Sequence, residues 1–406
     1  MNSNGVVIVG AGQAGFQVAA SLRQEGYEEP ISLIGDEPHL PYQRPPLSKG
    51  FMTGKQDIEG TALRPLAFYE SHGIDLLTST RVTALDRSDR SVRLASGSRI
   101  RYEKLVLAVG ARNRTLALKG AELDGVCYLR TDTEAAAISE RLEAARDVVV
   151  IGGGFIGLEL AAAARSLGKS VRVLELQARL MPRVVSPILS DFYNDLHAKQ
   201  GVQISLGAGV REIAGKQGKV SHVVMSDSSV FPADLILVGI GVVPNSELAR
   251  DAGLSDVNGI AVDEHLRTED ENIYAIGDCA DHPNPFAGGR VRIESVQNAV
   301  DQGKCVAAAI IGRSEDYRAV PWFWTDQFDT KLQMAGLSNG HGQAVTRGEP
   351  ESHKFSVFYF RDGRLAAIDS VNRPGDHLAG RKLLAARTPV TPEEAADLSV
   401  DLKTLK

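Results

Sequence analysis

Three glycines recur at the same spacing in two parts of the chain. The first copy is VVIVGAGQAGFQVAA (residues 6–20) and the second is VVVIGGGFIGLELAA (residues 148–162). The glycines are Gly10, Gly12 and Gly15 in the first copy, and Gly152, Gly154 and Gly157 in the second. In such a turn the first glycine permits the tight bend, the second lets a pyrophosphate approach the backbone, and the third lets a helix pack on a strand. The sequence therefore predicts two dinucleotide-binding turns.

An acidic residue follows each glycine group at the end of a second predicted strand. ISLIGDE ends in Asp36 and Glu37, and VRVLE ends in Glu175. A carboxylate in this place accepts hydrogen bonds from the 2′-hydroxyl of an adenosine ribose and repels a 2′-phosphate. A solvated strand end is the alternative interpretation of either acid taken by itself. Because each acid completes a glycine pattern, we expect both to contact a ribose.

The elements that hold these turns repeat as well. Each glycine group follows a β-branched run and opens an Ala-rich helical stretch. Each unit then closes with an apolar strand that ends in glycine, within YEKLVLAVGARNR (102–114) and ADLILVGIGVVPN (233–245). Strands that alternate with helices predict a mostly parallel, doubly wound α/β sheet. The sequence therefore predicts two tandem Rossmann-like domains.

Composition and charge narrow the class of protein. The chain has 406 residues, enough for two or three domains, and its formal net charge of −6 gives no sign of a nucleic-acid binder. Cys127, Cys279 and Cys305 lie far apart without disulfide or metal-ligand spacing, which favours a reducing cytoplasm and no metal site. The N-terminus leaves no room for a signal peptide, and the apolar run 148–164 is too short for a membrane span.

Further motifs carry a resemblance to a known family. TEDENIYAIGDCA (268–280) resembles the third signature of the two-dinucleotide-domain flavoproteins, in which FAD and a nicotinamide nucleotide occupy tandem folds of the glutathione-reductase type. HLPYQRPPLSKGF (39–51) lacks the redox cysteines that disulfide reductases carry there. PYQRPPLSK, SVQNAVDQGK (295–304) and PWFWTDQFDTKLQMAG (321–336) resemble instead the ferredoxin reductases of cytochrome P450 and dioxygenase systems, of the putidaredoxin reductase type.

The repeat and the resemblance together predict three domains. These are a discontinuous FAD-binding domain (1–112 and 245–318), an NAD-binding domain (113–244) and a smaller C-terminal α+β domain (319–406). In the last, KFSVFYF (354–360) and RLAAIDSVN (364–372) predict paired strands around Asp362-Gly363. TPVTPEEAADL predicts a capped terminal helix.

The resemblance also implies which residues contact the cofactors. Those for FAD are Gly10, Gly12, Ala14, Gly15, Asp36, Arg44, Lys49, Val82, Arg130, Asp278, Val296 and Trp324. Those for NADH are Gly152, Gly154, Ile156, Gly157, Glu159, Glu175 and Gly241. Val82, Arg130 and Trp324 have ordinary alternatives, because valine and tryptophan often pack in cores and an arginine before a helix is often a solvated cap.

Lys49 and Glu159 are the expected catalytic pair. Glu159 is charged within the apolar helical stretch FIGLELAAAA, and a carboxylate in such surroundings needs a partner. The resemblance places Lys49 near the flavin, where an ammonium stabilises the negative charge that reduction brings. We therefore expect the two to pair where flavin and nicotinamide meet. The alternative is a solvated Glu159 on a helix face.

The activity implied by the resemblance is an NADH-dependent flavoprotein reductase. It passes electrons from NADH through FAD, one at a time, to a [2Fe–2S] ferredoxin that feeds a cytochrome P450 or a dioxygenase. Arg172 and Arg179 lie close to Glu175 in the sequence and would weaken the preference for NADH over NADPH. Other acceptors (a rubredoxin, a quinone or monodehydroascorbate) are alternatives. So is an NADH-sensing flavoprotein that does not turn over.

A basic docking face is expected on the surface that meets the partner. Ferredoxins are usually acidic, and charge complementarity speeds the encounter of two proteins. Arg64, Lys304 and Lys331 are the candidates for this face, with isolated solvated side chains as the alternative.

Overall fold

The computed structural model describes residues 5–405 and divides into two compact units. Each unit is built from three stretches of the chain. The first comprises Met1–Gln43, Thr61–Arg112 and Val243–Phe323, and the second comprises Arg44–Gly60, Asn113–Val242 and Trp324–Lys406.

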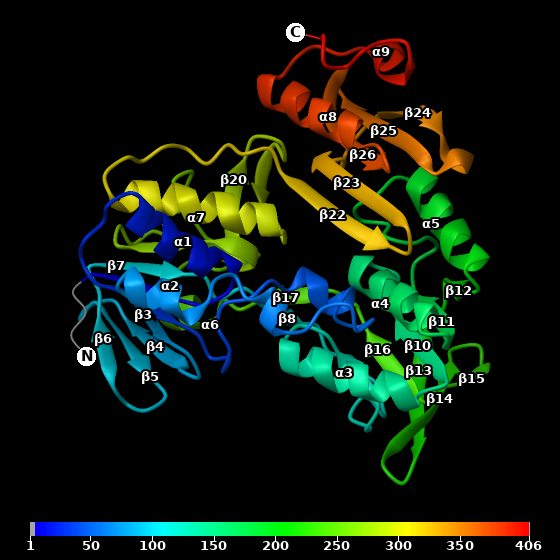
Figure 1. Cartoon of the computed structure of the whole chain (residues 1–406), viewed down its shortest axis with the longest axis horizontal. Coiled ribbons are helices and arrows are strands. Elements are labelled where there is room, and N and C mark those ends of the chain that lie inside the picture. Colours follow the sequence, from blue (N-terminus) through cyan, green and yellow to red (C-terminus); the bar gives the residue numbers. More distant parts are fainter. Residues whose placement is uncertain (1–4, 406) are drawn as a thin grey trace. The chain divides into compact units, whose positions relative to one another are not determined.

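A five-stranded parallel sheet forms the centre of the first unit (Figure 1). Its order is β19 (Ile273–Ala275), β7 (Lys104–Leu107), β1 (Val6–Val9), β2 (Ile31–Ile34) and β3 (Ile74–Leu77). β1 is buried along its whole length and pairs with β2 and β7. α1 (Gln13–Gln24) follows β1 and lies beside α7 (Val296–Ile310), because Gly303 lets the helices approach closely; a Cβ there would lie 2.8 Å from Cβ of Gln17.

Shorter elements complete the first unit. One antiparallel sheet contains β4 (Val82–Asp86), β5 (Ser91–Leu94) and β6 (Arg99–Arg101), and another sheet contains β18 (Ile260–Ala261), β20 (Ala280–Asn284) and β21 (Gly289–Val291). The remaining helices are α2 (Leu66–Ser71), α6 (Glu247–Asp251) and the 3₁₀ turn η3 (Gly277–Cys279). Three further elements contain residues of both units: the 3₁₀ turn η2 (Glu59–Thr61) and the strands β8 (Ala111–Asn113) and β17 (Val242–Pro244), which pair as a two-stranded sheet.

The second unit contains a parallel sheet of the same design. Its order is β12 (Gln203–Leu206), β11 (Ser170–Glu175), β10 (Asp147–Ile151), β16 (Leu235–Val238) and β9 (Val126–Tyr128). Its helices are α3 (Asp132–Ala144), α4 (Phe155–Ser166) and α5 (Pro187–Lys199), and a three-stranded antiparallel sheet contains β13 (Val210–Lys216), β14 (Lys219–Met225) and β15 (Val230–Pro232). α3 begins at a capping box formed by Thr131 and Glu134.

A second five-stranded sheet in this unit is built from the C-terminal part of the chain. Its order is β22 (Trp322–Gln327), β23 (Thr330–Gly336), β26 (Arg364–Val371), β25 (Lys354–Arg361) and β24 (Gln343–Glu349). α8 (Pro374–Ala386) packs on β23 and β26, and α9 (Pro392–Ala396) packs on β24 and β25; the 3₁₀ turn η4 spans Pro350–Ser352. The turn between β25 and β26 contains Asp362 and Gly363, both with positive φ as a tight hairpin requires.

The predicted fold class is confirmed, with two doubly wound sheets and a smaller α+β part. The expected strand pair around Asp362-Gly363 forms, and the terminal helix α9 begins at a capping box of Thr391 and Glu394. The two units differ from the expected three-domain division in two respects: residues 44–60 cluster with the second unit, and residues 324–406 cluster in that same unit with residues 113–242. η1 (Pro45–Ser48) in the first of these segments packs on α3 and α4, and Ser48 donates a hydrogen bond to Glu159 of α4.

No helix within residues 5–405 combines the length and the apolar character needed to cross a bilayer.

The stability of the folded chain should fall as the pH is lowered from 7 to 5. Burial lowers the pKa of His197 and of His282 to about 4, so the unfolded chain binds protons at these sites at higher pH than the folded chain does. Burial raises the pKa of Asp369 to about 7, which acts in the opposite direction but at only one site. Thermal unfolding at the two pH values measures the difference.

An Asp369→Asn variant provides the control for this prediction. It removes the opposing contribution, so its melting temperature should fall more steeply between pH 7 and pH 5 than that of the wild type. A melting temperature that is equal or higher at pH 5 in both proteins would contradict the assignment.

Candidate functional site

The first glycine turn (residues 10–15) has one open position between two crowded ones. Gly10 has a φ of +110°, and a Cβ there would lie 2.1 Å from the carbonyl oxygen of Ala108. A Cβ at Gly15 would lie 1.9 Å from the carbonyl oxygen of Gly10, whereas a Cβ at Gly12 would meet nothing within 4 Å. Gly12 is also the N-cap of α1 and offers no side-chain cap. The turn therefore leaves backbone N–H groups and space together, which suits a pyrophosphate.

The second glycine turn (residues 152–157) has the same geometry. Gly152 has a φ of +108°, and a Cβ there would lie 2.4 Å from the carbonyl oxygen of Gly239. A Cβ at Gly157 would lie 2.1 Å from the carbonyl oxygen of Gly152, but one at Gly154 would meet only an oxygen at 3.9 Å. Gly154 caps α4 without a side-chain hydrogen bond. The residues of both turns thus fit dinucleotide phosphates.

Glu175 lies at the end of β11 and is nearly buried, with 9% of its surface exposed. Its Oε2 accepts a hydrogen bond from the N–H of Gly153 (2.6 Å), and its Oε1 accepts one from the N–H of Gln177 (2.7 Å). The carboxylate is therefore fixed against the second glycine turn. Each oxygen keeps a further lone pair for a ribose hydroxyl.

The two arginines near Glu175 in sequence are occupied elsewhere. The Arg172 guanidinium lies 3.8 Å from the ring centroid of Phe231. Arg179 donates to the carbonyl oxygens of Val185 and Pro182 and to the hydroxyl of Ser190, at 2.7–2.8 Å. Arg172 also donates to Gln203 Oε1 and to Ser205 Oγ, so the donors of both arginines have partners. The geometry therefore does not favour a phosphate bound by Arg172 or Arg179. Instead Arg183, which the sequence did not single out, lies 3.6 Å from a Cβ built on Gly241.

Most of the residues expected for FAD lie in the first unit, around the first glycine turn. A Cβ built on Gly277 would lie 3.3 Å from Cβ of Ala14, so the turn η3 that contains Asp278 borders the start of α1. Asp36 is exposed and pairs with Arg81 at 3.8 Å, which places the neighbouring Val82 at the same edge. Val296 begins α7, the helix that packs against η3.

Lys49 and Glu159 form an ion pair within the second unit. Lys49 Nζ lies 3.1 Å from Glu159 Oε1, with the side chains 19% and 6% exposed. Lys49 also pairs with Asp326 at 3.6 Å and lies 5.8 Å from the ring centroid of Trp324. The expected pairing is thus present, and the solvated alternative for Glu159 is wrong.

Two hydroxyl groups that the sequence analysis did not select complete the surroundings of Glu159. Ser48 Oγ donates to Glu159 Oε2 and Thr325 Oγ1 donates to Glu159 Oε1, both at 2.5 Å. Ser48 belongs to η1 and Thr325 to β22, while Glu159 lies in the first half of α4. Ser48 is adjacent to Lys49 and Thr325 is adjacent to Trp324, and both neighbours were selected from the sequence, so adjacency was a usable signal for each.

The remaining residues of the expected site divide between the two units. Arg44 Nη1 donates to the carbonyl oxygen of Arg130 at 2.6 Å, so these two residues meet in the second unit, before α3. Trp324 lies in β22 of the same unit, and Ile156, in the first turn of α4, is 41% exposed. The exposure of Ile156 beside an open helix N-terminus is suited to ligand contact.

The cysteines have no nucleophilic role in this arrangement. Cys279 is fully buried, and burial raises the pKa of its thiol to about 11. The pKa of Cys305 is raised to about 11 by burial and then by Glu315 and Asp316. Both thiols therefore stay protonated near neutral pH, which excludes them from thiolate chemistry.

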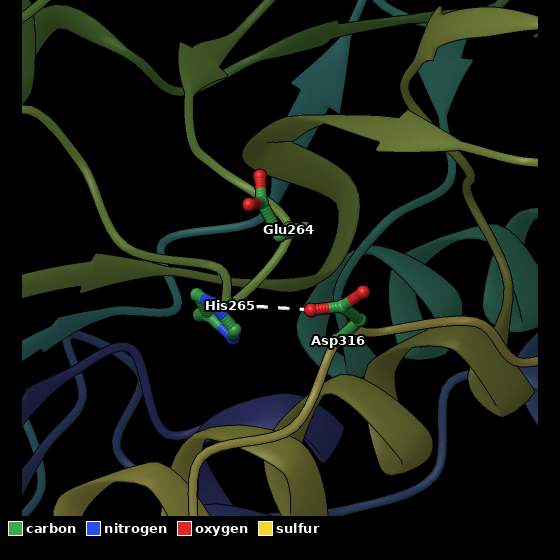
Figure 2. Close-up of side chains that lie close together, drawn as sticks. All are labelled: Glu264, His265 and Asp316. Carbon is green, nitrogen blue, oxygen red and sulfur yellow. Dashed lines mark ion pairs between the residues drawn. The ribbon is translucent and has the colours of Figure 1, made fainter.

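A separate group of titratable side chains lies in the first unit (Figure 2). The ligand atoms of Glu264, His265 and Asp316 lie within 4.8 Å of one another. Glu264 and Asp316 are exposed, and His265 Nε2 pairs with Asp316 at 3.8 Å. Arg318 donates to the same Asp316 carboxylate and already neutralises it. We interpret the group as a surface ion-pair network.

Substitution by alanine should have different effects at Gly154, where a Cβ has space, and at Gly157, where it does not. Gly154→Ala places its Cβ in open space, so we expect a stability change under about 1 kcal/mol and dinucleotide affinity lowered about tenfold. Gly157→Ala overlaps a backbone oxygen and should lower stability by about 3 kcal/mol. Denaturant unfolding and a titration with NADH measure the two quantities. Equal loss of stability in both variants would refute the assignment of Gly154 to ligand approach.

Comparison with known proteins agrees with this geometry. Residues 4–303 match the family model of the pyridine nucleotide-disulphide oxidoreductases, and residues 322–406 match that of the reductase C-terminal domain. The chain is 50% identical over 398 residues to rhodocoxin reductase of Rhodococcus erythropolis, which covers 98% of this chain and 93% of that protein.

Solved structures show the same likeness. The ferredoxin reductase for the CYP199A2 system of Rhodopseudomonas palustris superposes with a TM-score of 0.97 at 49% identity, covering 99% of both chains. The covalent putidaredoxin reductase–putidaredoxin complex gives 0.96 at 41% identity, covering 99% of this chain and 98% of that one. The chain therefore belongs to the pyridine nucleotide-disulphide oxidoreductase family.

Proposed function

We propose that the protein transfers electrons from NADH, through FAD, to a [2Fe–2S] ferredoxin that supplies a cytochrome P450 or a dioxygenase. The presence of two open glycine turns in one chain carries this proposal, because each turn suits one dinucleotide. Membership of the family makes the chain an oxidoreductase that uses FAD and a nicotinamide dinucleotide. The likeness to reductases named for ferredoxin partners supports the choice of acceptor.

When bound, FAD would supply the redox chemistry, namely acceptance of a hydride and release of electrons one at a time. The chain supplies binding, orientation and charge. We assign FAD to the first glycine turn, with Ala14, Asp36 and Asp278 around it, and the nicotinamide nucleotide to the second, with Ile156, Glu175 and Gly241. Arg44, Val82, Arg130, Val296 and Trp324 stay proposed contacts of FAD.

Lys49 is proposed to stabilise the negative charge that develops on the flavin. Its ammonium is held between Glu159 and Asp326, so its position is set before a ligand binds. Glu159 in turn is held by Ser48 and Thr325. We assign Glu159 to orient Lys49 and to accept a hydrogen bond from the nicotinamide carboxamide.

NADH is the proposed coenzyme. The side chain of Glu175 is fixed against the second glycine turn, and a carboxylate in that place would repel a 2′-phosphate. Arg172 and Arg179, which would have weakened this preference, are engaged with Phe231 and with the residues that lead into α5. All three cysteines are free thiols, which supports a place in the reducing cytoplasm.

Stopped-flow mixing under anaerobic conditions tests the function. FAD-loaded protein is mixed with NADH in the presence of an oxidised [2Fe–2S] ferredoxin, and both chromophores are followed. We expect rapid bleaching of the flavin, followed by reduction of the iron–sulfur centre. If the flavin is bleached but the ferredoxin stays oxidised, the electron acceptor is another molecule, such as a rubredoxin or a quinone. Slow bleaching together with NADH-dependent dimerisation would favour a sensor.

Reversal of charge tests the proposed docking face. Arg64 and Lys304 are exposed on the first unit, whereas Lys331 is 52% exposed on the second and pairs with Asp326. Arg64→Glu with Lys304→Glu should raise the KM for ferredoxin about tenfold, because both charges would repel an acidic partner. Turnover of NADH with ferricyanide should be unchanged.

Lys216→Glu is the matched control for the docking variants, since it reverses an exposed charge on the β13–β14 hairpin. It should leave the KM for ferredoxin within about twofold of the wild-type value. An equal rise in both proteins, or a joint loss of the ferricyanide activity, would disprove the assignment of Arg64 and Lys304.

A further inference from the structure

Glu159 is joined by hydrogen bonds to a series of buried polar side chains that have no role in the proposed reaction. Thr325, Gln327 and His197 are each 0% exposed. Thr325 and Gln327 point from alternate positions of β22, and His197 comes from the last turn of α5. Thr325 Oγ1 lies 3.3 Å from Gln327 Nε2, and Gln327 Oε1 lies 2.8 Å from His197 Nε2.

The direction of these hydrogen bonds is set by what each atom can do. Glu159 Oε1 is a carboxylate oxygen and only accepts, so the single proton of Thr325 Oγ1 is directed to it. Thr325 Oγ1 can then only accept from Gln327, which the amide Nε2 of Gln327 satisfies. The Gln327 carbonyl Oε1 accepts in its turn from His197 Nε2.

His197 is suited to begin this line. Burial lowers its pKa to about 4, so the ring is neutral near pH 7 and carries one proton. The other ring nitrogen, Nδ1, is buried and has no hydrogen-bond partner among the residues that the structure describes. A proton on Nδ1 would leave an unsatisfied N–H donor in the interior, so the proton belongs on Nε2.

We propose that His197, Gln327 and Thr325 form a one-directional donor chain that positions the carboxylate of Glu159, and through it the ammonium of Lys49. These three are positioning residues, since none touches Lys49 directly. The proposal rests on the function given above for Glu159 and Lys49. It adds that residues of α5 and β22 position Glu159 of α4 and Lys49, the residue that follows η1.

As a consequence of this donor chain, Glu159 Oε1 accepts from two donors, each held at a defined position. Thr325 holds it at 2.5 Å and Lys49 at 3.1 Å, while Ser48 holds Oε2. Without the Thr325 proton, Oε1 keeps only the contact with Lys49, and the broad terminal torsion of the carboxylate is restrained by Ser48 alone on the other oxygen. Lys49, which also pairs with Asp326 at 3.6 Å, would then be held less firmly by Glu159.

Single-turnover reduction of the FAD-loaded protein by NADH tests this. In Thr325→Val, which removes the hydroxyl but keeps the shape, we expect the limiting rate constant to fall about tenfold, the loss of one charge-assisted hydrogen bond. The dissociation constant for NADH should stay within about threefold, because the proposed contacts of Gly154, Ile156 and Glu175 with the dinucleotide are unchanged. Thr325→Ser should restore the rate, and Gln327→Leu should lower it in the same direction but less.

Thr330→Val is the matched control, because Thr330 is 1% exposed in the neighbouring strand and bonds a different carboxylate, that of Asp329. Its rate should equal that of the wild type. Glu159→Gln supplies the reference. If Glu159→Gln is slow while Thr325→Val is not, or if Thr330→Val is equally slow, the donor chain is overturned and the proposed function survives. If Glu159→Gln is as fast as the wild type, both the role of Glu159 and the inference fail.

A second readout does not depend on turnover. Imidazole ¹⁵N NMR of the FAD-loaded protein, with the His197 signal assigned from a His197→Gln variant, should show a neutral ring protonated on Nε2 at pH 7. Gln327→Leu should change this signal, and Thr330→Val should not. A ring protonated on Nδ1, or on both nitrogens, would overturn the inference. If wild-type flavin were not reduced by NADH at all, the proposed function would fail, and the His197 signal would still report on the chain.

Discussion

The second unit depends on the burial of one carboxylate. Glu159 is 6% exposed on a helix whose neighbouring residues are also buried, and an isolated charge in such a place is strongly unfavourable. It is tolerated because three donors surround it, from Ser48, Lys49 and Thr325. These donors come from two other stretches of the chain, so burying Glu159 explains why η1 and β22 join α4 in one unit.

Within each glycine turn, some glycines are needed for packing and another leaves space for a ligand. In each turn the outer glycines are required by the fold, because a Cβ at Gly15 or Gly157 would overlap a carbonyl oxygen. The middle glycines, Gly12 and Gly154, have space around them that the fold itself does not need. Open space at an uncapped helix N-terminus is what a phosphate group requires. Within one short motif, different glycines therefore serve packing and ligand binding.

The features that could be predicted from the sequence are those defined by residue types a few positions apart. The glycine turns and the acid at Glu175 are each defined within a few residues of a strand end, and the hairpin at Asp362-Gly363 follows from its own turn chemistry. Glu159 could be expected to have a partner because a charge in an apolar helix is anomalous in itself. Lys49 was found through resemblance rather than through spacing.

The features that sequence could not predict depend on tertiary packing. Ser48 and Thr325 are ordinary hydroxyl residues until the fold brings them to Glu159 from distant parts of the chain. Residues 44–60 follow the first glycine unit without a break, and only tertiary contacts, such as those of Ser48 and Lys49 with Glu159, place them in the second unit. The engagement of Arg172 with Phe231 is likewise a tertiary contact that spacing does not encode.

The division of the second unit into three stretches has a consequence for biosynthesis. A ribosome delivers the chain from its N-terminus at about 5–20 residues per second, so η1 appears early, α4 later and β22 near the end. Before β22 is synthesised, Thr325, Asp326 and Trp324 are absent, so the contacts that they make with Glu159 and Lys49 cannot form. The polar surroundings of Glu159 can therefore be completed only once the C-terminal sheet has emerged.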